Sequence, residues 1–362
     1  PNGRRLALAA GFGLAVGLAF LAKYAALYAI IGVAVHLVLS REARGAWSWS
    51  TAGAAIAAFF LVLAPNLAWN AANDFSTVQH TAANAAWGGR KLFNFPELGD
   101  FLASQFGVFG PIPFAVLLGG LVWLGLRRRL TGPDLLLACF ALPPLLIVTG
   151  QSFISRANAN WSGAAYVAGS VLVAAWLIRW KAQWWLRGAL ALQALLAALF
   201  LACVLDPTLA DKVGLSNSFK RAKGWEQLTA QIVERTMAEG YRTVTAVAVD
   251  DRFMFNTAAY YGRDFFGLDG APPLRMWVRE AHPQNQAETS DPLTREQGRR
   301  VLAVSLEPGF RQEMARDFGA TSDNQIVSVR LDAKRRRRAE LFIGEFFQPR
   351  PRDPATGLPP KG

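Results

Sequence analysis

The stretch Gly17–Ile30, GLAFLAKYAALYAI, places one lysine inside an apolar run that is otherwise typical of a membrane-spanning helix. A lysine at the bilayer centre costs about 2.5–3.5 kcal/mol on insertion scales, so it needs a partner or access to water. As one helix, the run from Leu6 to Leu39 would be about 51 Å long, against about 30 Å of hydrocarbon. We therefore predict two short spans that meet in a turn at Lys23–Tyr24, where the ammonium reaches the membrane surface.

Other long apolar segments fill the first part of the 362-residue chain, which is 52% hydrophobic. Further spans are predicted at about 49–67, 99–126, 132–150, 161–178 and 186–204, which gives about seven in all. The net charge of +12 is concentrated beside these segments, at residues 4–5, 41–44, 127–129 and 179–187. Seven spans bring all these clusters to one side, which is the positive-inside pattern of membrane proteins rather than a nucleic-acid-binding surface.

The composition becomes charge-rich after Asp206, and apolar runs alternate between helical and strand patterns. The predicted fold class is therefore a multispanning α-helical membrane domain (1–205) followed by a small α/β domain (206–348) on the outer side. The Pro- and Gly-rich tail (349–362) is expected to be disordered. Within the α/β domain, Asp250–Arg252 follow a predicted strand, where sites of α/β proteins often lie, but we interpret them as a capped helix start rather than a site. Arg335–Arg338 are interpreted as a solvated loop or a contact with anionic headgroups.

The two cysteines, Cys139 and Cys203, lie in apolar segments, so neither a disulfide nor a cysteine zinc site is indicated. The three histidines lack metal-ligand spacing, and no metal site is predicted, although the use of a divalent metal stays open. The chain opens at Pro1 without a methionine and runs directly into an apolar segment. We expect it to be the carboxy-terminal part of a longer protein.

Three segments share the predicted outer face: the Lys23–Tyr24 turn and the loops 70–98 and 150–160. They bring basic residues to the side where positive-inside logic disfavours them, namely Lys23, Arg90, Lys91 and Arg156. An anionic lipid headgroup or a lipid-linked phosphate would explain this excess. Structural roles stay open for each: a snorkelling lysine, a solvated turn at Arg90–Lys91, or an ion pair of Arg156 with a loop carboxylate.

The same outer segments supply further polar and aromatic side chains that are candidates for contact with substrate. They are Asn70, His80, Asn158, Asn160 and Trp161. Structural alternatives stay open here too, because Trp161 is also typical of an interfacial aromatic and His80 of a surface histidine.

Four motifs resemble those of glycosyltransferase family 39, which includes protein O-mannosyltransferases and the aminoarabinose transferase of lipid A. GLAFLAKYAALY resembles the family's G-L-x-x-L-S-K-Y-T element, and LAPNLAWNAANDFSTVQH (63–80) resembles its P-x-x-x-W-N element. FLASQFGVFGPIPF (101–114) is similar to its Q-x-x-x-x-x-P span, and NANWSGAAYVAG (158–169) to its N-W-P-A-x-A-Y element. The motifs occur in the family's order, although Ala22 and Ala25 depart from its Ser and Thr.

This resemblance implies a C-type glycosyltransferase fold that takes a sugar from a polyprenyl phosphate carrier, usually with inversion. It implies that Lys23, with Tyr24, Arg90 and Arg156, holds the carrier phosphate. The acceptor would be a lipid, glycan or protein on the periplasmic face of a bacterial inner membrane. The family's catalytic acid lies in the first outer loop, but the first acid here is Glu42, on the predicted cytoplasmic side. The base is therefore expected in a missing amino-terminal part, which would leave this chain inactive alone.

Two other classes of protein remain as alternatives to the glycosyltransferase. A transporter or flippase for a lipid-linked or anionic solute predicts internal repeats and polar groups at mid-membrane depth, of which Gln105 is one of few. A non-catalytic membrane scaffold would need no basic residues on the outer face. The interacting molecules predicted here are the lipid-linked donor, the acceptor and membrane lipids, but no nucleic acid.

Overall fold

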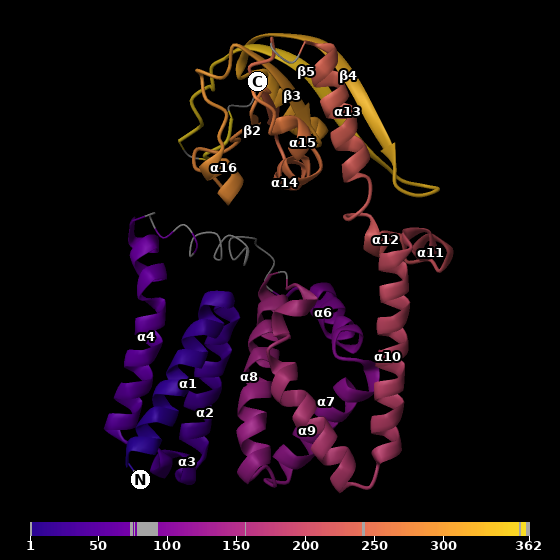
Figure 1. The fold of residues 1–362 in the computed structure, drawn as a ribbon. Helices are drawn as coiled ribbons and strands as arrows, with labels where there is room; N and C mark the ends of the chain where they lie inside the picture. The colour runs from indigo at the N-terminus through magenta and orange to yellow at the C-terminus, as the bar shows by residue number, and fades with distance from the viewer. Residues whose placement is uncertain are drawn as a thin grey trace. The chain divides into compact units, whose positions relative to one another are not determined.

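A computed structural model describes residues 2–72, 75, 77, 93–155, 157–240, 243–354 and 356–359. The chain divides into two compact units, Pro1–Leu199 and Phe200–Gly362, so the division falls inside one long helix. The first unit consists of helices, and the second contains a five-stranded sheet with helices (Figure 1). The predicted fold class, a helical multispanning part followed by a small α/β domain, is confirmed at this level.

The helical unit is built mainly from long apolar helices. Their bounds are α1 (Asn2–Ala22), α2 (Leu27–Leu39), α3 (Arg41–Ala46), α4 (Trp49–Ala72), α6 (Phe95–Val108), α7 (Pro111–Leu126), α8 (Gly132–Ile154), α9 (Ala165–Arg179) and α10 (Gln183–Leu205). Short 3₁₀ turns η1 (Tyr24–Ala26) and η2 (Ala159–Ser162) precede α2 and α9.

The break predicted at Lys23 is present between α1 and η1. Lys23 adopts an extended conformation, with φ −163° and ψ 132°, and ends the helical path of α1. Helix α1 packs mainly on α4, and α2 packs on α8. A Cβ added to Gly13 would lie 2.0 Å from the carbonyl oxygen of Ala55 in α4, so this contact requires a glycine. Gly13 and Gly17, four positions apart on α1, thus form a close contact with α4, since small residues let two helix backbones approach.

The predicted span 99–126 is not one straight helix. Helices α6 and α7 meet at an angle of 116°. Gly110, with φ 95°, separates them, and Pro111 begins α7. A positive φ leaves the helical region, and a proline supplies no N–H to continue the hydrogen-bond ladder. The pair is therefore either a broken span or a re-entrant segment.

Four helices of the described residues are long and apolar enough to cross a membrane, or five if the bent pair counts as one span. They are α1, α4, α8 and α10. The segment Tyr24–Leu39 and helix α9 are apolar but shorter. The number of about seven spans thus stays a prediction that depends on these short helices.

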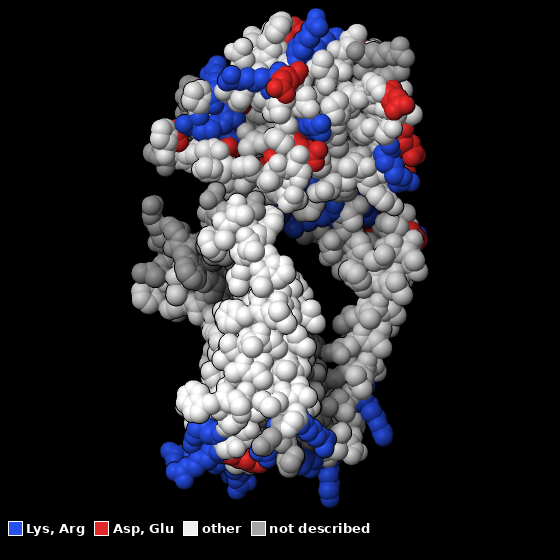
Figure 2. Space-filling model, turned by 60° about the vertical axis from the view of Figure 1, so that its left-hand side comes forward, with Lys and Arg blue, Asp and Glu red and all other residues white. Residues whose placement is uncertain are grey.

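The basic clusters of the helical unit gather at one end. The start of α1, helix α3, the α7–α8 connection and the α9–α10 connection all lie at this end (Figure 1). Figure 2 shows Lys and Arg there, while the middle of the helices carries neither on the face in view. Asp134 at the start of α8 accepts hydrogen bonds from Arg179 at 2.8 and 3.0 Å and from Trp176 at 2.9 Å, which fixes α8 to α9. The opposite end carries the η1 and η2 turns.

The second unit holds a sheet of strand order β2-β1-β3-β5-β4. The strands are β1 (Ala246–Val249), β2 (Leu274–Met276), β3 (Arg300–Ser305), β4 (Phe318–Arg330) and β5 (Arg336–Phe347). Strand β1 pairs in parallel with β2 and β3, whereas β5 pairs antiparallel with β3 and β4. The helices are α11 (Pro207–Lys212), α12 (Ser216–Phe219), α13 (Trp225–Ala238), α14 (Arg252–Tyr261), α15 (Arg263–Phe266), α16 (Gln286–Ser290) and α17 (Pro308–Ala315).

Both faces of this sheet are covered. Val247 and Val249 point to the core that contains α13 and α14, whereas Ala246 and Ala248 point to the core that contains α17. All four residues of β1 are fully buried, which explains why its sequence is a continuous apolar run.

Two expectations for this unit have different outcomes. Asp251 caps α14 by accepting from the N–H groups of Phe253 and Met254, as predicted for a capped helix start. Disorder of the tail stays a prediction; in its described part, Arg352 forms an ion pair with the buried Asp317 at 2.9 Å. This pair neutralises a carboxylate that is 1% exposed.

Candidate functional site

Lys23 lies at the break between α1 and η1, at the end of the helical unit opposite to the basic clusters. Its N–H donates to the carbonyl of Ala19, and its carbonyl accepts from Ala26. The side chain is exposed, and the structure describes no hydrogen bond or ion pair of its ammonium within the described part of the chain. A cation held by the backbone of a helix break is able to meet an anion without first breaking an internal ion pair.

Tyr24 is connected to the end of α4 through a chain of hydrogen bonds. Its hydroxyl donates to Thr77 Oγ1 at 2.8 Å, and Thr77 donates to Asn70 Oδ1. Asn70 is 3% exposed, and its amide donates to the carbonyl of Asn66 at 3.0 Å. The structure therefore brings together Tyr24 and Asn70, two predicted residues from separate motifs, and fixes the turn that carries Lys23.

A second polar cluster joins the other two motifs inside the helical unit. Gln105 on α6 is fully buried, and its Oε1 accepts from Ser162 at 2.7 Å and from Tyr166 at 2.6 Å. Its Nε2 donates to the carbonyl of Ala159 in η2 at 3.2 Å. Every polar atom of the Gln105 amide is thus used between α6 and the η2–α9 segment. This arrangement favours a structural role for Gln105 over the mid-membrane polar site of a transporter.

The η2 turn places the remaining described candidates at the same end of the unit as Lys23. Asn158 precedes the turn and is exposed, Asn160 is exposed, and Trp161 is half-buried. Nearby, Asn94 N–H donates to the carbonyl of Phe153, which fastens the start of α6 to the end of α8. Asn158 and Asn160 therefore have accessible amides at this surface.

Four predicted site residues lie outside the described residues: His80, Arg90, Lys91 and Arg156. Their convergence with Lys23 stays a prediction. The carboxylates described near this end belong to Glu97 and Asp100 in the first turns of α6, and neither is assigned as a catalytic base. Within the described part of the chain, no group of three or more His, Cys, Asp or Glu could hold a metal ion.

Sequence reasoning did not single out three residues that connect these motifs: Thr77, Ser162 and Tyr166. Ser162 and Tyr166 are four positions apart, the spacing that places two side chains on one face of a helix. That spacing was a readable signal, but their common partner, Gln105, is on another helix. For Thr77 the sequence offered no comparable signal.

The comparisons with known proteins give one relative by sequence. The chain is 39% identical over 197 residues to a lipid A galacturonosyltransferase, RgtD, of Rhizobium johnstonii. The match covers 54% of this chain and 41% of that protein, so the chain spans less than half of the relative's length. No protein-family model matches the chain, and no solved structure matches it. The match to a glycosyltransferase confirms the resemblance to the lipid-linked-sugar glycosyltransferases that the four motifs indicate.

Proposed function

We propose that this chain is part of a membrane glycosyltransferase that moves a sugar from a polyprenyl phosphate carrier to a lipid acceptor. The main support is the match to the lipid A galacturonosyltransferase. Because that relative is named for transfer of galacturonic acid to lipid A, lipid A is the first acceptor to test, and a galacturonosyl group is the first sugar to test.

The observation that carries the assignment to particular residues is the exposed ammonium of Lys23 at the α1–η1 break. In the proposed reaction, the bond between the anomeric carbon and the phosphate oxygen breaks, and an acceptor hydroxyl forms the new bond with inversion. The leaving polyprenyl phosphate gains negative charge as this bond breaks. A cation beside it stabilises that charge, and the Lys23 ammonium can reach it without first leaving an ion pair within the described residues.

Tyr24 would position Lys23 rather than react. Its bond to Thr77, which in turn bonds Asn70, couples the turn to α4, so that the backbone of Lys23 keeps a defined place relative to α4. The proton of the acceptor hydroxyl must go to a base, and no described residue is assigned to that role.

The proposed orientation has the basic clusters in the cytoplasm and Lys23 on the outer, periplasmic face of a bacterial inner membrane. Its support is the concentration of Lys and Arg at one end of the helical unit (Figure 2). The carrier, as an amphiphile, would keep its chain in the bilayer and its phosphate at the surface beside η1.

The test uses the complete gene product in detergent with a polyprenyl-phosphate sugar and measures release of free polyprenyl phosphate. Release should fall about a hundredfold in Lys23→Ala, the size expected when one charge-stabilising donor is lost. It should be partly retained in Lys23→Arg. Arg5→Ala, which removes a cation from the other end of α1, is the matched control and should release carrier normally.

Equal release from wild type and Lys23→Ala would refute the role of Lys23 but leave the transferase. No release with any donor, together with uptake of a lipid-linked solute into reconstituted vesicles, would refute the transferase in favour of a transporter.

A further inference from the structure

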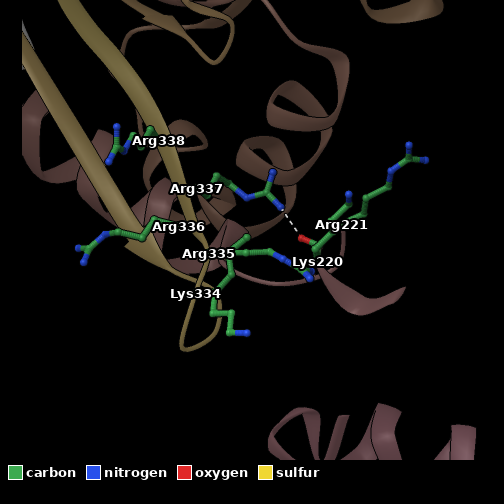
Figure 3. Close-up of a pocket in the computed structure, with 8 residues that line it drawn as sticks. Lys220, Arg221, Lys334, Arg335, Arg336, Arg337 and Arg338 are labelled. Atoms are coloured by element: carbon green, nitrogen blue, oxygen red, sulfur yellow. Dashed lines mark hydrogen bonds between the residues drawn. The ribbon is translucent and has the colours of Figure 1, made fainter. Parts of the chain in front are cut away.

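The sheet unit contains an open basic pocket of about 540 Å³ (Figure 3). Seven basic residues and Leu331 line it; the basic ones are Lys220, Arg221, Lys334 and Arg335–Arg338. None of the described lining residues is acidic. A concave surface lined by cations, without an acidic residue in its lining, concentrates field lines and attracts anions.

The pocket is held in shape by Arg337. Its guanidinium stacks on the ring of Trp225, with 3.5 Å between the guanidinium carbon and the ring centroid. It also donates to the carbonyls of Lys220 at 2.9 Å and Lys223 at 3.0 Å. These contacts fix the β4–β5 hairpin to the segment before α13. Arg337 is therefore a wall of the pocket, and its Nε and Nη2 groups already donate to backbone carbonyls.

Several other cations are not used by the fold. The side chains of Lys220, Arg221 and Lys334 are exposed, and the structure describes no hydrogen bond or ion pair for them within its described residues. By contrast, nearby Lys223 is held by Asp211 at 2.8 Å. Figure 3 shows Arg335 extending towards the Lys220–Arg221 segment, whereas Arg336 and Arg338 point to the other side of the hairpin.

Arg335 adds a second observation that points to an anion. Its Nη1 is buried and has no hydrogen-bond acceptor among the described atoms. The nearest carboxylate oxygen, on Asp332, is 3.8 Å away. Asp332 already accepts from the backbone N–H groups of Lys334 and Arg335. A buried guanidinium nitrogen without an acceptor is costly unless a bound oxygen completes it.

The pocket is connected to the end of a membrane helix within the same unit. Phe219, directly before Lys220, packs on Phe200 near the end of α10, with 5.2 Å between ring centroids. Helix α10 is long and apolar enough to span a membrane. Cations that follow a span closely are attracted to anionic lipids, because they lie within a Debye length of the headgroups.

We propose that the basic pocket binds the phosphate groups of an anionic phospholipid headgroup at the membrane surface. Its volume exceeds what one phosphate needs, which suits a headgroup with two phosphates. The free cations Lys220, Arg221 and Lys334 meet the phosphate oxygens, and Arg335 Nη1 donates to one of them. This binding is independent of the proposed sugar transfer, since it involves other residues on the other unit.

The experiment measures amide hydrogen exchange of the complete gene product in nanodiscs of phosphatidylcholine, with and without increasing cardiolipin. Cardiolipin should protect the amides of 218–222 and 331–338. In the double variant Lys220→Gln/Arg221→Gln, the cardiolipin concentration that gives half of the maximal protection should rise about 30-fold, because each lost cation weakens binding about fivefold. The single variant Lys334→Gln should need about fivefold more.

The matched control is Arg295→Gln/Arg299→Gln, which removes two exposed cations before β3 and should leave the cardiolipin response unchanged. Unchanged exchange in β1 and β3 verifies that each variant is folded. Protection of the same segments by inorganic phosphate in pure phosphatidylcholine discs would overturn the lipid as the ligand. Absence of protection, or equal cardiolipin responses of pocket and control variants, would overturn the pocket itself.

Discussion

Asp250 is a partly buried carboxyl at the end of β1, and its replacement by asparagine should stabilise the sheet unit at neutral pH. Its oxygens accept from the hydroxyl of Ser305 and from the N–H of Leu306 at 3.0 Å. Burial, opposed by these hydrogen bonds, raises the pKa of Asp250 from 3.8 to about 6. The carboxylate is therefore less favourable in the folded unit than in the unfolded chain.

The size and sign of the effect follow from this pKa. A rise from 3.8 to about 6 corresponds to about 3 kcal/mol. Below about pH 4 both states hold the proton, and the stabilising difference is fully present. As pH rises towards about 6, the unfolded state loses its proton first, so the free energy of unfolding falls; above that it stays at the lower value. Asp250→Asn keeps the uncharged form at every pH.

The assay is hydrogen exchange of the β1 and β3 amides in the detergent-solubilised gene product, corrected for the intrinsic pH dependence of exchange. The opening free energy of Asp250→Asn should exceed that of wild type by up to about 3 kcal/mol at about pH 7, and the two should converge near pH 4. Asp269→Asn, at an exposed position, is the control. A variant that is less stable than wild type at both pH values would refute the reasoning.

Three further substitutions test the packing of the helical unit by thermal unfolding in detergent. Gly13→Ala should lower the free energy of unfolding by about 1–3 kcal/mol, because the added Cβ would overlap a backbone oxygen of α4. Gly11→Ala, which has open space around it, should leave stability unchanged, and equal effects of the two substitutions would contradict the close contact. Gln105→Ala should lower the free energy of unfolding by about 2–4 kcal/mol, since the buried hydroxyls of Ser162 and Tyr166 lose their shared acceptor. An unchanged midpoint of thermal unfolding would mean that these hydroxyls find other partners. Asp134→Ala should lower the free energy of unfolding by about 1–3 kcal/mol, because the buried indole N–H of Trp176 loses its acceptor. Arg179→Ala should cost less, because the Arg179 side chain is more than half exposed; equal costs of the two substitutions would contradict this division of roles.

The helix breaks illustrate how far the sequence predicts this fold. The break at Lys23 was predictable, because the apolar run is too long for one span and its single charge must reach the membrane surface. The break at Gly110–Pro111 was not, although its residues are typical of one. Pro65 lies inside the continuous helix α4, and Pro143 inside α8. A proline leaves the carbonyl four residues earlier without a donor. Whether the helix ends there depends on neighbouring helices that can satisfy this carbonyl, and the sequence of one segment does not reveal those neighbours.

The fold of the sheet unit was easier to predict from the sequence than the side-chain contacts of the candidate site. The helical and strand patterns after Asp206 predicted a small α/β domain with a helix start at Asp250–Arg252, because periodicity and burial are local properties. The tail contact through Arg352 was missed, since it depends on a carboxylate thirty-five positions earlier in the chain. Likewise, the motifs marked Tyr24 and Asn70 separately, but the hydrogen-bond chain between them arises from packing across helices.

The most direct test of the central claim is transfer of sugar to an acceptor lipid. The complete gene product in detergent would receive lipid A and polyprenyl-phosphate galacturonic acid, and both lipids would be followed by mass spectrometry. The proposed function predicts that lipid A gains one sugar for each polyprenyl phosphate released, and that Lys23→Ala slows both together. Intact donor and unmodified lipid A, in a preparation that moves the donor across vesicles, would contradict it.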